Sequence, residues 1–248
     1  MHDVDQAVFE RNIAYYSNAR SVQEYTREEG LRDIERELVR AFMPPPPARI
    51  IDLGCGAGRT TFGLGQAGYA MTAIDLAEPL IAHARRKYPG LDFRIMNAAA
   101  LEFPASSFDG ALFSYNGIDS LFPVAERRRC LSEVSRVLKP DAAFILSTHN
   151  AIGHFFSGGH LYPRGYVNAA KLLAAQWGNR HLRHWYFRYG ESDRSELLFS
   201  APPGHTRAQL EDAGFEVLDI SGATGERDMS RIRMRQRHVY FVARKPAA

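Results

Sequence analysis

Three glycines and two aspartates are the residues of this chain whose types and spacing point most directly to chemistry. Gly54, Gly56 and Gly58 stand on alternate positions, so one side of the turn lacks Cβ atoms and its backbone can touch a flat ligand. Asp52 precedes the turn. Asp75 follows at about the 20-residue spacing at which an acid on the next strand meets a ribose. A carboxylate suits that role because it can accept a hydrogen bond from each of two vicinal hydroxyls.

A strand, a turn and a helix must position these residues. Residues 50–53 are mostly apolar and β-branched, which is typical of a strand buried on both faces of a parallel sheet. Residues 59–61 open a helix whose N-terminal amides face the same crevice. A second strand over residues 69–76 ends at Asp75. The same aspartate could also simply cap the helix that follows, and the glycines could form an ordinary tight turn.

The turn does not match the dinucleotide fingerprint G-x-G-x-x-G, because its last glycine would fall at position 59, where Arg59 stands. The text D-L-G-C-G-A-G, which begins at Asp52, instead resembles motif I of the class I S-adenosylmethionine-dependent methyltransferases. Together with Asp75 and the phrase L-S-E-V-S-R-V-L-K-P before a fifth strand, this resemblance spans residues 49–148.

The resemblance implies an α/β fold: a Rossmann-like, seven-stranded, mostly parallel sheet with helices on both faces and an antiparallel last strand. The expected further strands are residues 91–96, 111–114, 142–147, 215–220 and 238–243. Beyond the helix that begins at residue 59, the expected helices after the first strand are residues 78–87, 126–138 and 206–214, with Thr206 as an N-cap of the last.

We expect one methyltransferase domain over residues 1–248, with an N-terminal helical lid over residues 1–47. An amphipathic helix over about 29–43 should end at the proline run 44–47. Tyr16 and Tyr25 are the better candidates for a lid over the ligand. The alternative, that the tyrosines of this segment pack its helices onto the sheet, is left open.

An aromatic-rich and histidine-rich segment, residues 149–202, follows the fifth strand and predicts an inserted substrate cap with a hairpin over 181–189 and 195–200. Aromatic walls exclude water and stack on flat substrates. A satellite core under a long connection is the alternative.

The resemblance implies S-adenosylmethionine as the cofactor and a set of residues around it. Asn97 stands where the family usually has an acid; its carbonyl can still accept from the adenine amino group, or it could only shape a turn. The expected cofactor-binding residues are Asp52, Gly54, Cys55, Gly56, Gly58, Asp75, Leu76, Asn97, Ala98, Ala99, Ser114, Tyr115, Tyr16 and Tyr25.

A hydroxyl acceptor needs a base, and histidine titrates near neutral pH. His149, just past the fifth strand, is the best-placed candidate, followed by His154 and His160. A structural role for each is equally open, and an amine acceptor can react without a base.

Four arginines on alternate positions, from Arg231 to Arg237, are expected to share one face of a strand. They could bind phosphate or carboxylate groups, or form a solvated edge that discourages pairing with other strands.

Composition sets the remaining bounds. The chain has 248 residues and a formal net charge of +3, which does not demand a polyanionic partner such as nucleic acid. Its two cysteines, Cys55 and Cys130, provide neither a disulfide framework nor a zinc site, and we expect no metal. The charged N-terminus does not resemble a signal peptide and no stretch could span a membrane, so we expect a cytoplasmic protein. Its oligomeric state is open, with a homodimer as one alternative.

The chain lacks the [D/N/S]-P-P-[Y/F] tetrapeptide and the Pro-Cys pair that mark nucleic-acid methyltransferases. The sequence therefore predicts an enzyme that methylates an oxygen or nitrogen of a small, aromatic or natural-product-like molecule. The alternatives are an RNA- or protein-directed methyltransferase and a non-catalytic S-adenosylmethionine-binding module.

Overall fold

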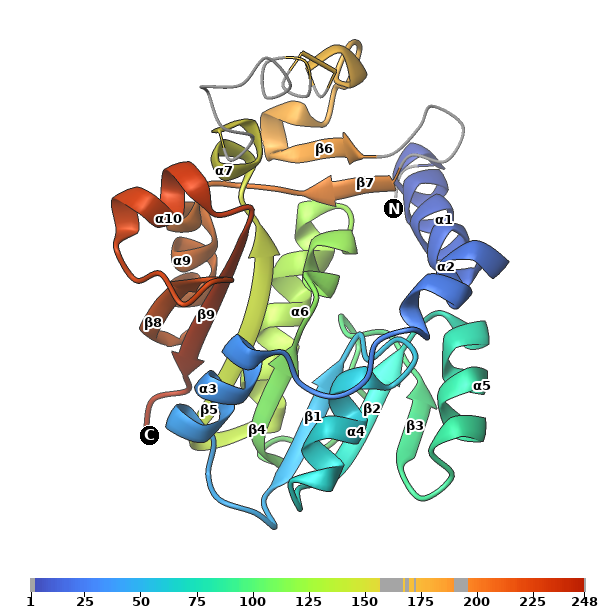
Figure 1. The fold of residues 1–248 in the computed structure, drawn as a ribbon, viewed down its shortest axis with the longest axis vertical. Helices are drawn as coiled ribbons and strands as arrows, with labels where there is room; N and C mark the ends of the chain where they lie inside the picture. The colour runs from blue at the N-terminus through green and yellow to red at the C-terminus, as the bar shows by residue number, and fades with distance from the viewer. Residues whose placement is uncertain (1–2, 157–166, 168–169, 172, 190–195, 248) are drawn as a thin grey trace.

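A seven-stranded sheet runs through the computed structural model, which describes residues 3–156, 167, 170–171, 173–189 and 196–247 (Figure 1). Its order is β3-β2-β1-β4-β5-β9-β8. The strands are β1 (Arg49–Leu53), β2 (Ala70–Asp75), β3 (Asp92–Ile95), β4 (Phe108–Phe113), β5 (Leu138–His149), β8 (Glu216–Gly222) and β9 (His238–Arg244). Strands β1 to β5 are parallel, and β9 runs antiparallel to both β5 and β8. The predicted Rossmann-like sheet with an antiparallel last strand is confirmed.

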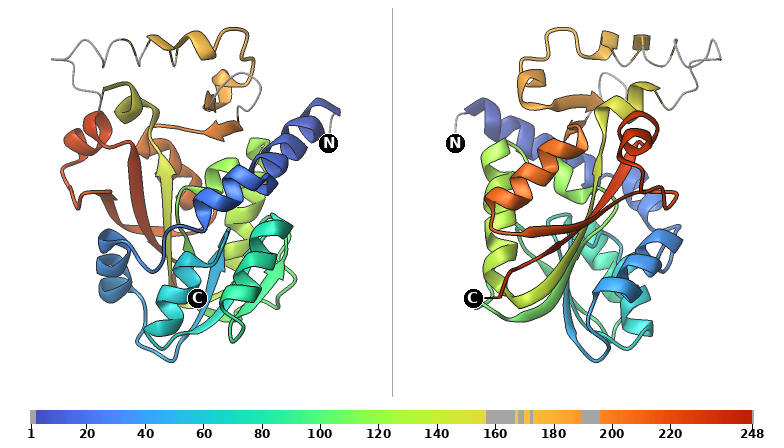
Figure 2. Two further views of the ribbon diagram at one scale, coloured as in Figure 1. Left: turned by 45° about the vertical axis from the view of Figure 1, so that its right-hand side comes forward. Right: turned by 90° about the vertical axis from the view of Figure 1, so that its left-hand side faces the viewer.

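Helices cover both faces of this sheet (Figure 2). The helices of the described residues are α1 (Asp3–Ser17), α2 (Ala19–Tyr25), α3 (Asp33–Phe42), α4 (Arg59–Gln66), α5 (Glu78–Lys87), α6 (Val124–Val137), α7 (Ala151–Phe156), α9 (Pro203–Asp212) and α10 (Met229–Arg235), with 3₁₀ turns η1 (Gly117–Ser120) and η2 (Leu182–His184). Helices α3, α4 and α5 pack on one face, and α6 and α9 pack on the other.

Helix α3 belongs to the cover of the sheet. Its apolar residues recur at helical spacing, and Ile34, Leu38 and Val39 are buried against strand residues such as Ile50. It begins at Asp33, later than expected, and ends at Phe42, just before the prolines. Of the segment expected to form a lid, it is therefore α1 and α2 that lie away from the sheet face.

Two local predictions are wrong. Helix α9 begins at Pro203, so Thr206 lies inside the helix and is not its N-cap. Residues 229–235 form α10, so the arginines from Arg231 onward do not share a strand face. Asp228 caps this helix by accepting from the amides of Ser230 and Arg231. The alternating arginines alone could not reveal helix α10, because its start is marked by the capping residue Asp228 and not by the spacing of the arginines.

The segment after β5 does contain the expected hairpin. Strands β6 (Tyr186–Tyr189) and β7 (Glu196–Phe199) pair antiparallel above the carboxyl ends of the parallel strands. The hydroxyl of Tyr186 donates to the carbonyl oxygen of Leu121 at 2.6 Å, which ties the hairpin to the loop after η1. His160 and the rest of residues 157–166 lie outside the described residues.

The side chain of Asn12 joins helix α1 to this hairpin. Its amide nitrogen donates to the carbonyl oxygens of Leu197 and Ser120, both at 3.0 Å, and its oxygen accepts from the amide of Leu197 at 3.2 Å. Asn12 thus meets the edge of β7 as the peptide group of a neighbouring strand would.

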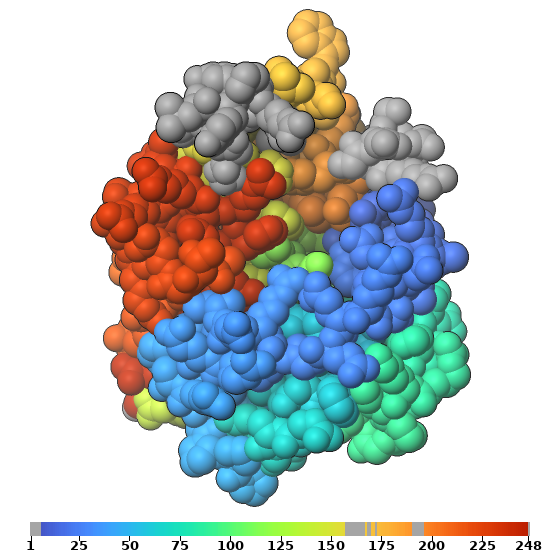
Figure 3. Space-filling view, in the orientation of Figure 1, coloured from blue at the N-terminus to red at the C-terminus, as the bar shows by residue number. Residues whose placement is uncertain are grey.

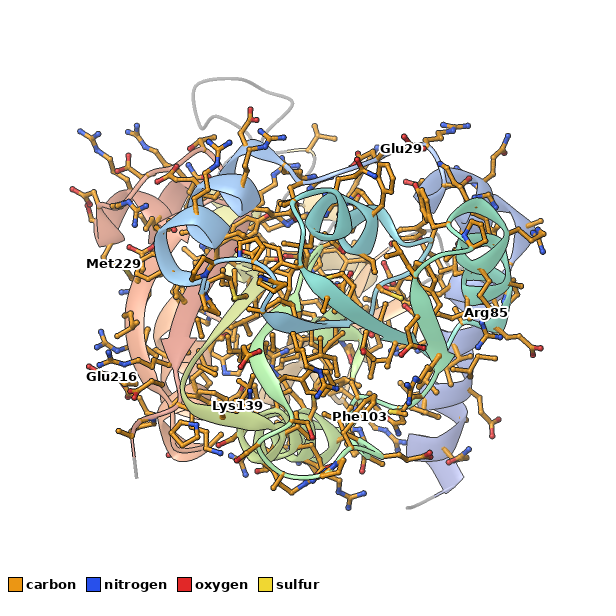
Figure 4. The ribbon with its side chains drawn as sticks, turned by 90° about the horizontal axis from the view of Figure 1, so that it is seen from below. Glu29, Arg85, Phe103, Lys139, Glu216 and Met229 are labelled. Atoms are coloured by element: carbon orange, nitrogen blue, oxygen red, sulfur yellow. The ribbon has the colours of Figure 1, made fainter. Side chains whose placement is uncertain are left out.

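At the opposite end of the sheet, seen from below in Figure 4, a side chain ties together the starts of three strands. Asp109 of β4 accepts from Lys139 of β5 at 2.6 Å and from the backbone amide of Arg49 of β1 at 2.8 Å. The hydrogen bonds of Asp109 thus join the strands at their amino ends. The cavity described below lies at their carboxyl ends.

Candidate functional site

The glycine turn lies between β1 and α4 and forms part of a cavity wall. Gly56 has a φ of +54°, and a Cβ built on it would meet only Leu80, at 3.9 Å, because its open side faces the cavity. Gly58 is different: its φ is +86°, and a Cβ there would lie 2.8 Å from the ring of Phe93. Gly56 therefore leaves room for a ligand, and Gly58 leaves room for the protein's own packing.

Asp75, the last residue of β2, faces the same cavity. One carboxylate oxygen accepts from the amide of Gly56 at 2.9 Å and the other from the amide of Ala77 at 2.8 Å. Burial raises the pKa of this carboxyl, and these backbone hydrogen bonds oppose the rise. Asp75 thus holds the glycine turn against the start of α5, and it lines the cavity.

Asp52 lies behind the turn, and the residues that line the cavity do not include it. One of its oxygens accepts from the hydroxyls of Thr60 and Thr61, both at 2.6 Å, and the other has no partner among the described residues. Burial raises the pKa of Asp52 to about 6. Asp52 orders the start of α4; a contact with an ammonium group of the ligand stays a prediction.

The cavity has a volume of about 140 Å³, roughly ten times the smallest cavity that holds a water molecule. Of the expected cofactor residues it brings together Gly54, Cys55, Gly56, Asp75, Leu76, Ala98, Ser114, Tyr115, Tyr16 and Tyr25. Other lining residues are Phe9, Asn12, Ile13, Glu24, Glu28, Ala57, Arg59, Thr60, Ala77, Leu80, Met96, Phe113, Gly117, Ser120 and Leu121. Asp52, Gly58, Asn97 and Ala99 do not line it.

Asn97 takes the role of a turn former. Its side-chain oxygen accepts from the amide of Ala99 at 2.9 Å, so the residue between them, Ala98, is the one that reaches the cavity. The alternative that Asn97 shapes a turn therefore describes what its oxygen does in this structure.

Tyrosine rings close the cavity from the side of α1 and α2. The ring of Tyr25 lies 5.7 Å from that of Tyr16 and 5.6 Å from that of Tyr115, measured between centroids. The side chain of Tyr16 is hydrogen-bonded to that of Glu196 in the hairpin. Burial raises the pKa of the Tyr16 hydroxyl well above its usual value. In Figure 3 a hollow opens between this part of the chain and the C-terminal part, with segments from the middle of the chain at its floor.

One wall of the cavity contains an ion pair that the sequence did not reveal. The buried carboxylate of Glu35, on α3, accepts from two nitrogens of Arg59, on α4, at 2.7 and 2.8 Å. Arg59 also donates to the carbonyl oxygen of Gly30 at 2.7 Å and to the hydroxyl of Ser114 at 3.2 Å. The guanidinium lowers the pKa of Glu35 against the effect of burial. This group fixes the segment before α3 beside the cavity.

A second buried ion pair was missed as well. Asp119 of η1 accepts from Arg127 of α6 at 2.8 Å, and both side chains are completely buried. The other oxygen of Asp119 accepts from the backbone amide of His149 at 2.7 Å and lies 2.9 Å from its Nδ1. No local spacing signals this arrangement, because the three residues come from η1, α6 and β5.

Two further histidines surround His149, which does not itself line the cavity. The ring of His238 lies 5.1 Å from it, and Asn116 places its amide nitrogen 2.7 Å from Nδ1 of His238 and 3.5 Å from Nε2 of His149. Burial lowers the pKa values of His154 and His238 to about 4, so both are neutral at pH 7. His154 packs against Tyr189, with ring centroids 5.1 Å apart.

Among the described ranges, no group of three or more histidine, cysteine or acidic side chains could hold a metal ion. In the same part of the chain, no helix has the length and apolar character needed to cross a membrane.

Comparisons with known proteins find methyltransferases. The family described as "Methyltransferase domain" matches residues 50–141, which contain the glycine turn and Asp75. A demethylmenaquinone methyltransferase of Renibacterium salmoninarum is 27% identical over 177 residues, which cover 64% of this chain and 73% of the relative. A ubiquinone biosynthesis O-methyltransferase of Xanthomonas axonopodis pv. citri is 26% identical over 211 residues, 84% of this chain and 79% of the relative.

A solved structure shares the fold. The 1,6-didemethyltoxoflavin-N1-methyltransferase of Burkholderia thailandensis, with 1,6-didemethyltoxoflavin and S-adenosylhomocysteine bound, superposes with a TM-score of 0.66. The alignment covers 99% of this chain and 91% of that one at 20% identity.

Proposed function

Because this chain is a class I S-adenosylmethionine-dependent methyltransferase, we propose that it methylates an oxygen or nitrogen of a small aromatic molecule. The cavity carries the proposal: it joins the open side of Gly56, the carboxylate of Asp75 and the tyrosines of the lid in one space. The bound cofactor supplies an electrophilic methyl group on a sulfonium, so the protein's task is to bind, orient and exclude water.

The residues present fit this cofactor. The carboxylate of Asp75 offers about four acceptor positions, of which the backbone amides of Gly56, Leu76 and Ala77 use three, so it can still accept from a ribose hydroxyl. The apolar side chains of Leu76 and Leu80 lie beside it and suit the faces of an adenine. The backbone around Ser114 and Tyr115 would hold the methionine part, and Tyr16 and Tyr25 would close over the ligand.

A small acceptor is supported by how the cavity is covered. The lid of α1 and α2 and the hairpin β6–β7 are joined through Asn12, so the site lies under these elements and not on an open face. The relatives point the same way, since demethylmenaquinone, ubiquinone and 1,6-didemethyltoxoflavin are small molecules. The RNA- or protein-directed alternative relied on four arginines that share one strand face. It loses that basis, because Arg231, Arg233 and Arg235 belong to helix α10. Cytoplasmic location and oligomeric state stay predictions.

His149 is the residue that we assign to proton removal. Its Nδ1 is bonded to a buried carboxylate, which is the usual way in which a protein orients a basic imidazole. His154 is the second candidate, but its pKa of about 4 makes it the weaker base at neutral pH.

Cofactor binding tests the first half of the proposal. Titration calorimetry with S-adenosylmethionine and S-adenosylhomocysteine should detect both ligands. Asp75→Ala should weaken binding by about 10- to 100-fold, the effect of losing hydrogen bonds to a charged group. Asp92→Ala is the matched control, since Asp92 begins the neighbouring strand β3 and does not line the cavity. Equal affinities of the two variants would refute the assignment of Asp75.

Methyl transfer tests the second half. The protein would be incubated with methyl-labelled S-adenosylmethionine and two matched panels, hydroxyarenes and aminoarenes, with products read by mass spectrometry. Label on a member of either panel supports a small aromatic acceptor. Label transferred only to added RNA or protein, with a steep dependence of RNA binding on salt, would overturn it.

A further inference from the structure

We propose that Asp119 is a positioning residue for methyl transfer: it holds His149 as the tautomer with its proton on Nδ1, so that the lone pair on Nε2 can take the proton of the acceptor in place of its 3.5 Å contact with the Asn116 amide. Arg127 in turn holds Asp119. The inference rests on the proposed function and adds two residues to its machinery that no sequence motif points to.

The carboxylate of Asp119 has no freedom to turn. One oxygen is fixed by Arg127 at 2.8 Å, and the other meets two donors of the same residue, the amide and Nδ1 of His149, at 2.7 and 2.9 Å. Neither side chain of the ion pair is exposed at all. Because a carboxylate can only accept, Nδ1 of a neutral His149 must carry the ring proton.

Asn116 supports the same tautomer from the other side of the ring. Its amide nitrogen lies 2.7 Å from Nδ1 of His238, which is neutral at pH 7 and accepts there. The same nitrogen lies 3.5 Å from Nε2 of His149, so this atom also faces a donor. The amide group of Asn116 can donate to both rings only if Nε2 of His149 carries a lone pair. A proton on that nitrogen would face an N–H group instead.

The position of the pair connects it to the cavity. Asp119 and Asn116 belong to the stretch 114–121, and Tyr115, Gly117 and Ser120 of that stretch line the cavity. The same turn therefore shapes the cavity wall and carries the carboxylate that orients His149.

Several ionisable groups surround His149. They come from β9, α7, β6, β7, α6 and the connection before β9: His238, His154, Tyr189, Glu196, Arg127 and Arg237. Asp119 is the one that bonds to the ring of His149 directly.

With a hydroxyl acceptor the step balances as follows. The acceptor oxygen forms a bond to the methyl carbon, and the bond from that carbon to sulfur breaks with its electron pair left on sulfur. The hydroxyl proton passes to Nε2 of His149. The sulfonium becomes a neutral thioether, and the positive charge that it loses appears on the imidazolium, opposite the carboxylate of Asp119.

The test reads the tautomer directly. Two-bond ¹H–¹⁵N spectra of histidine-labelled protein, saturated with S-adenosylhomocysteine at pH 8, distinguish Nδ1–H from Nε2–H, and the resonances of His149 are assigned from their loss in His149→Gln. We expect the Nδ1–H form in the wild type. We expect a mixture, or the Nε2–H form, in Asp119→Asn/Arg127→Met, which removes both charges and leaves neither buried alone.

The controls separate this inference from the proposed function. Asp109→Asn, on β4 and bonded to Lys139, should leave the tautomer unchanged. Calorimetry with S-adenosylhomocysteine should give the same affinity for the double variant and the wild type, whereas failure of both to bind would speak against the proposed function. An Nε2–H form in the wild type, or an unchanged Nδ1–H form in the double variant, would overturn the role of Asp119. On a hydroxyarene methylated by the wild type, kcat should fall about 100-fold in the double variant.

Discussion

Two buried ion pairs flank the site, and they are built differently. Glu35 and Arg59 form a pair with two hydrogen bonds, and the remaining donors of Arg59 meet Gly30 and Ser114. Asp119 and Arg127 share a single hydrogen bond, and the second oxygen of Asp119 is given to a histidine. Both pairs also bond to neighbouring groups: Glu35 accepts from the amide of Arg32 and the hydroxyl of Ser114, and Arg127 donates to Gln209 and to the carbonyl oxygen of Ile118. The difference is that the carboxylate of the second pair also bonds to a histidine ring.

The difference shows that a buried ion pair can fix two helices against each other in one place and orient a histidine ring in another. A buried pair rarely adds stability over apolar residues of the same shape, but breaking it is costly. Glu35 and Arg59 use that constraint to hold α3 against α4. Asp119 and Arg127 use it to present a carboxylate, away from water, to an imidazole.

The largest expected effect comes from breaking each pair in turn. Arg127→Met should reduce the free energy of unfolding by about 3–5 kcal/mol, because it leaves Asp119 charged and fully buried. Arg59→Met should cost less, at or below the lower end of that range, since Arg59 borders the cavity, which lets water reach the carboxylate that it leaves behind. Urea unfolding followed by circular dichroism measures both. Equal losses would mean that the two pairs are equivalent and that the comparison fails.

A smaller effect should appear when the protein is acidified, and on the His149 side it comes from His238. His238 has a pKa of about 4 in the folded protein and near 6.5 when unfolded, so the unfolded chain binds the proton first. Its contribution is fully present above pH 6.5 and is lost as the pH falls from 6.5 to about 4, an effect on the order of 3 kcal/mol.

Comparing variants isolates this term. The difference in unfolding free energy between wild type and His238→Gln should shrink as the pH is lowered from 7 to 4. Asp52 has a raised pKa of about 6, so its contribution to stability changes with pH in the opposite sense. That contribution cancels in the difference, because both proteins contain Asp52. A difference that stays constant over that range would contradict the assignment.

The smallest effect is expected on the surface. Arg207 and Glu211 of α9 form an exposed pair at 2.9 Å, four residues apart on one helix. Glu211→Gln should change the free energy of unfolding by no more than about 0.5 kcal/mol. A loss as large as that of Arg127→Met would show that the cost of breaking an ion pair in this protein does not depend on its burial.

The sequence was sufficient for the half of the site that the backbone builds. Glycine at alternate positions and an aspartate at the end of the next strand are local requirements of a turn, so they predicted where Gly56 and Asp75 lie. The mostly parallel sheet with its antiparallel last strand followed from the same resemblance, and the hairpin β6–β7 followed from two short segments joined by a turn-forming stretch.

The other half depends on partners that are distant in the chain. Glu35 meets Arg59 across 24 positions, and Asp119 meets His149 across 30. Nothing near Asp119 in the sequence distinguishes it from a surface acid of a short turn, and His149 was singled out only by its place after a strand. The arginine stripe failed for a related reason, since a period of two over seven residues fits a short polar helix as well as a strand.

The side chain of Asn12 gives the molecule a mechanical property. A two-stranded hairpin is barely stable by itself, and here its free edge is completed by an amide that belongs to the first helix. Helix α1 therefore cannot move away from the hairpin without breaking the two hydrogen bonds between Asn12 and the backbone of Leu197. An opening of the cavity on the side of α1 would therefore disturb the hairpin as well.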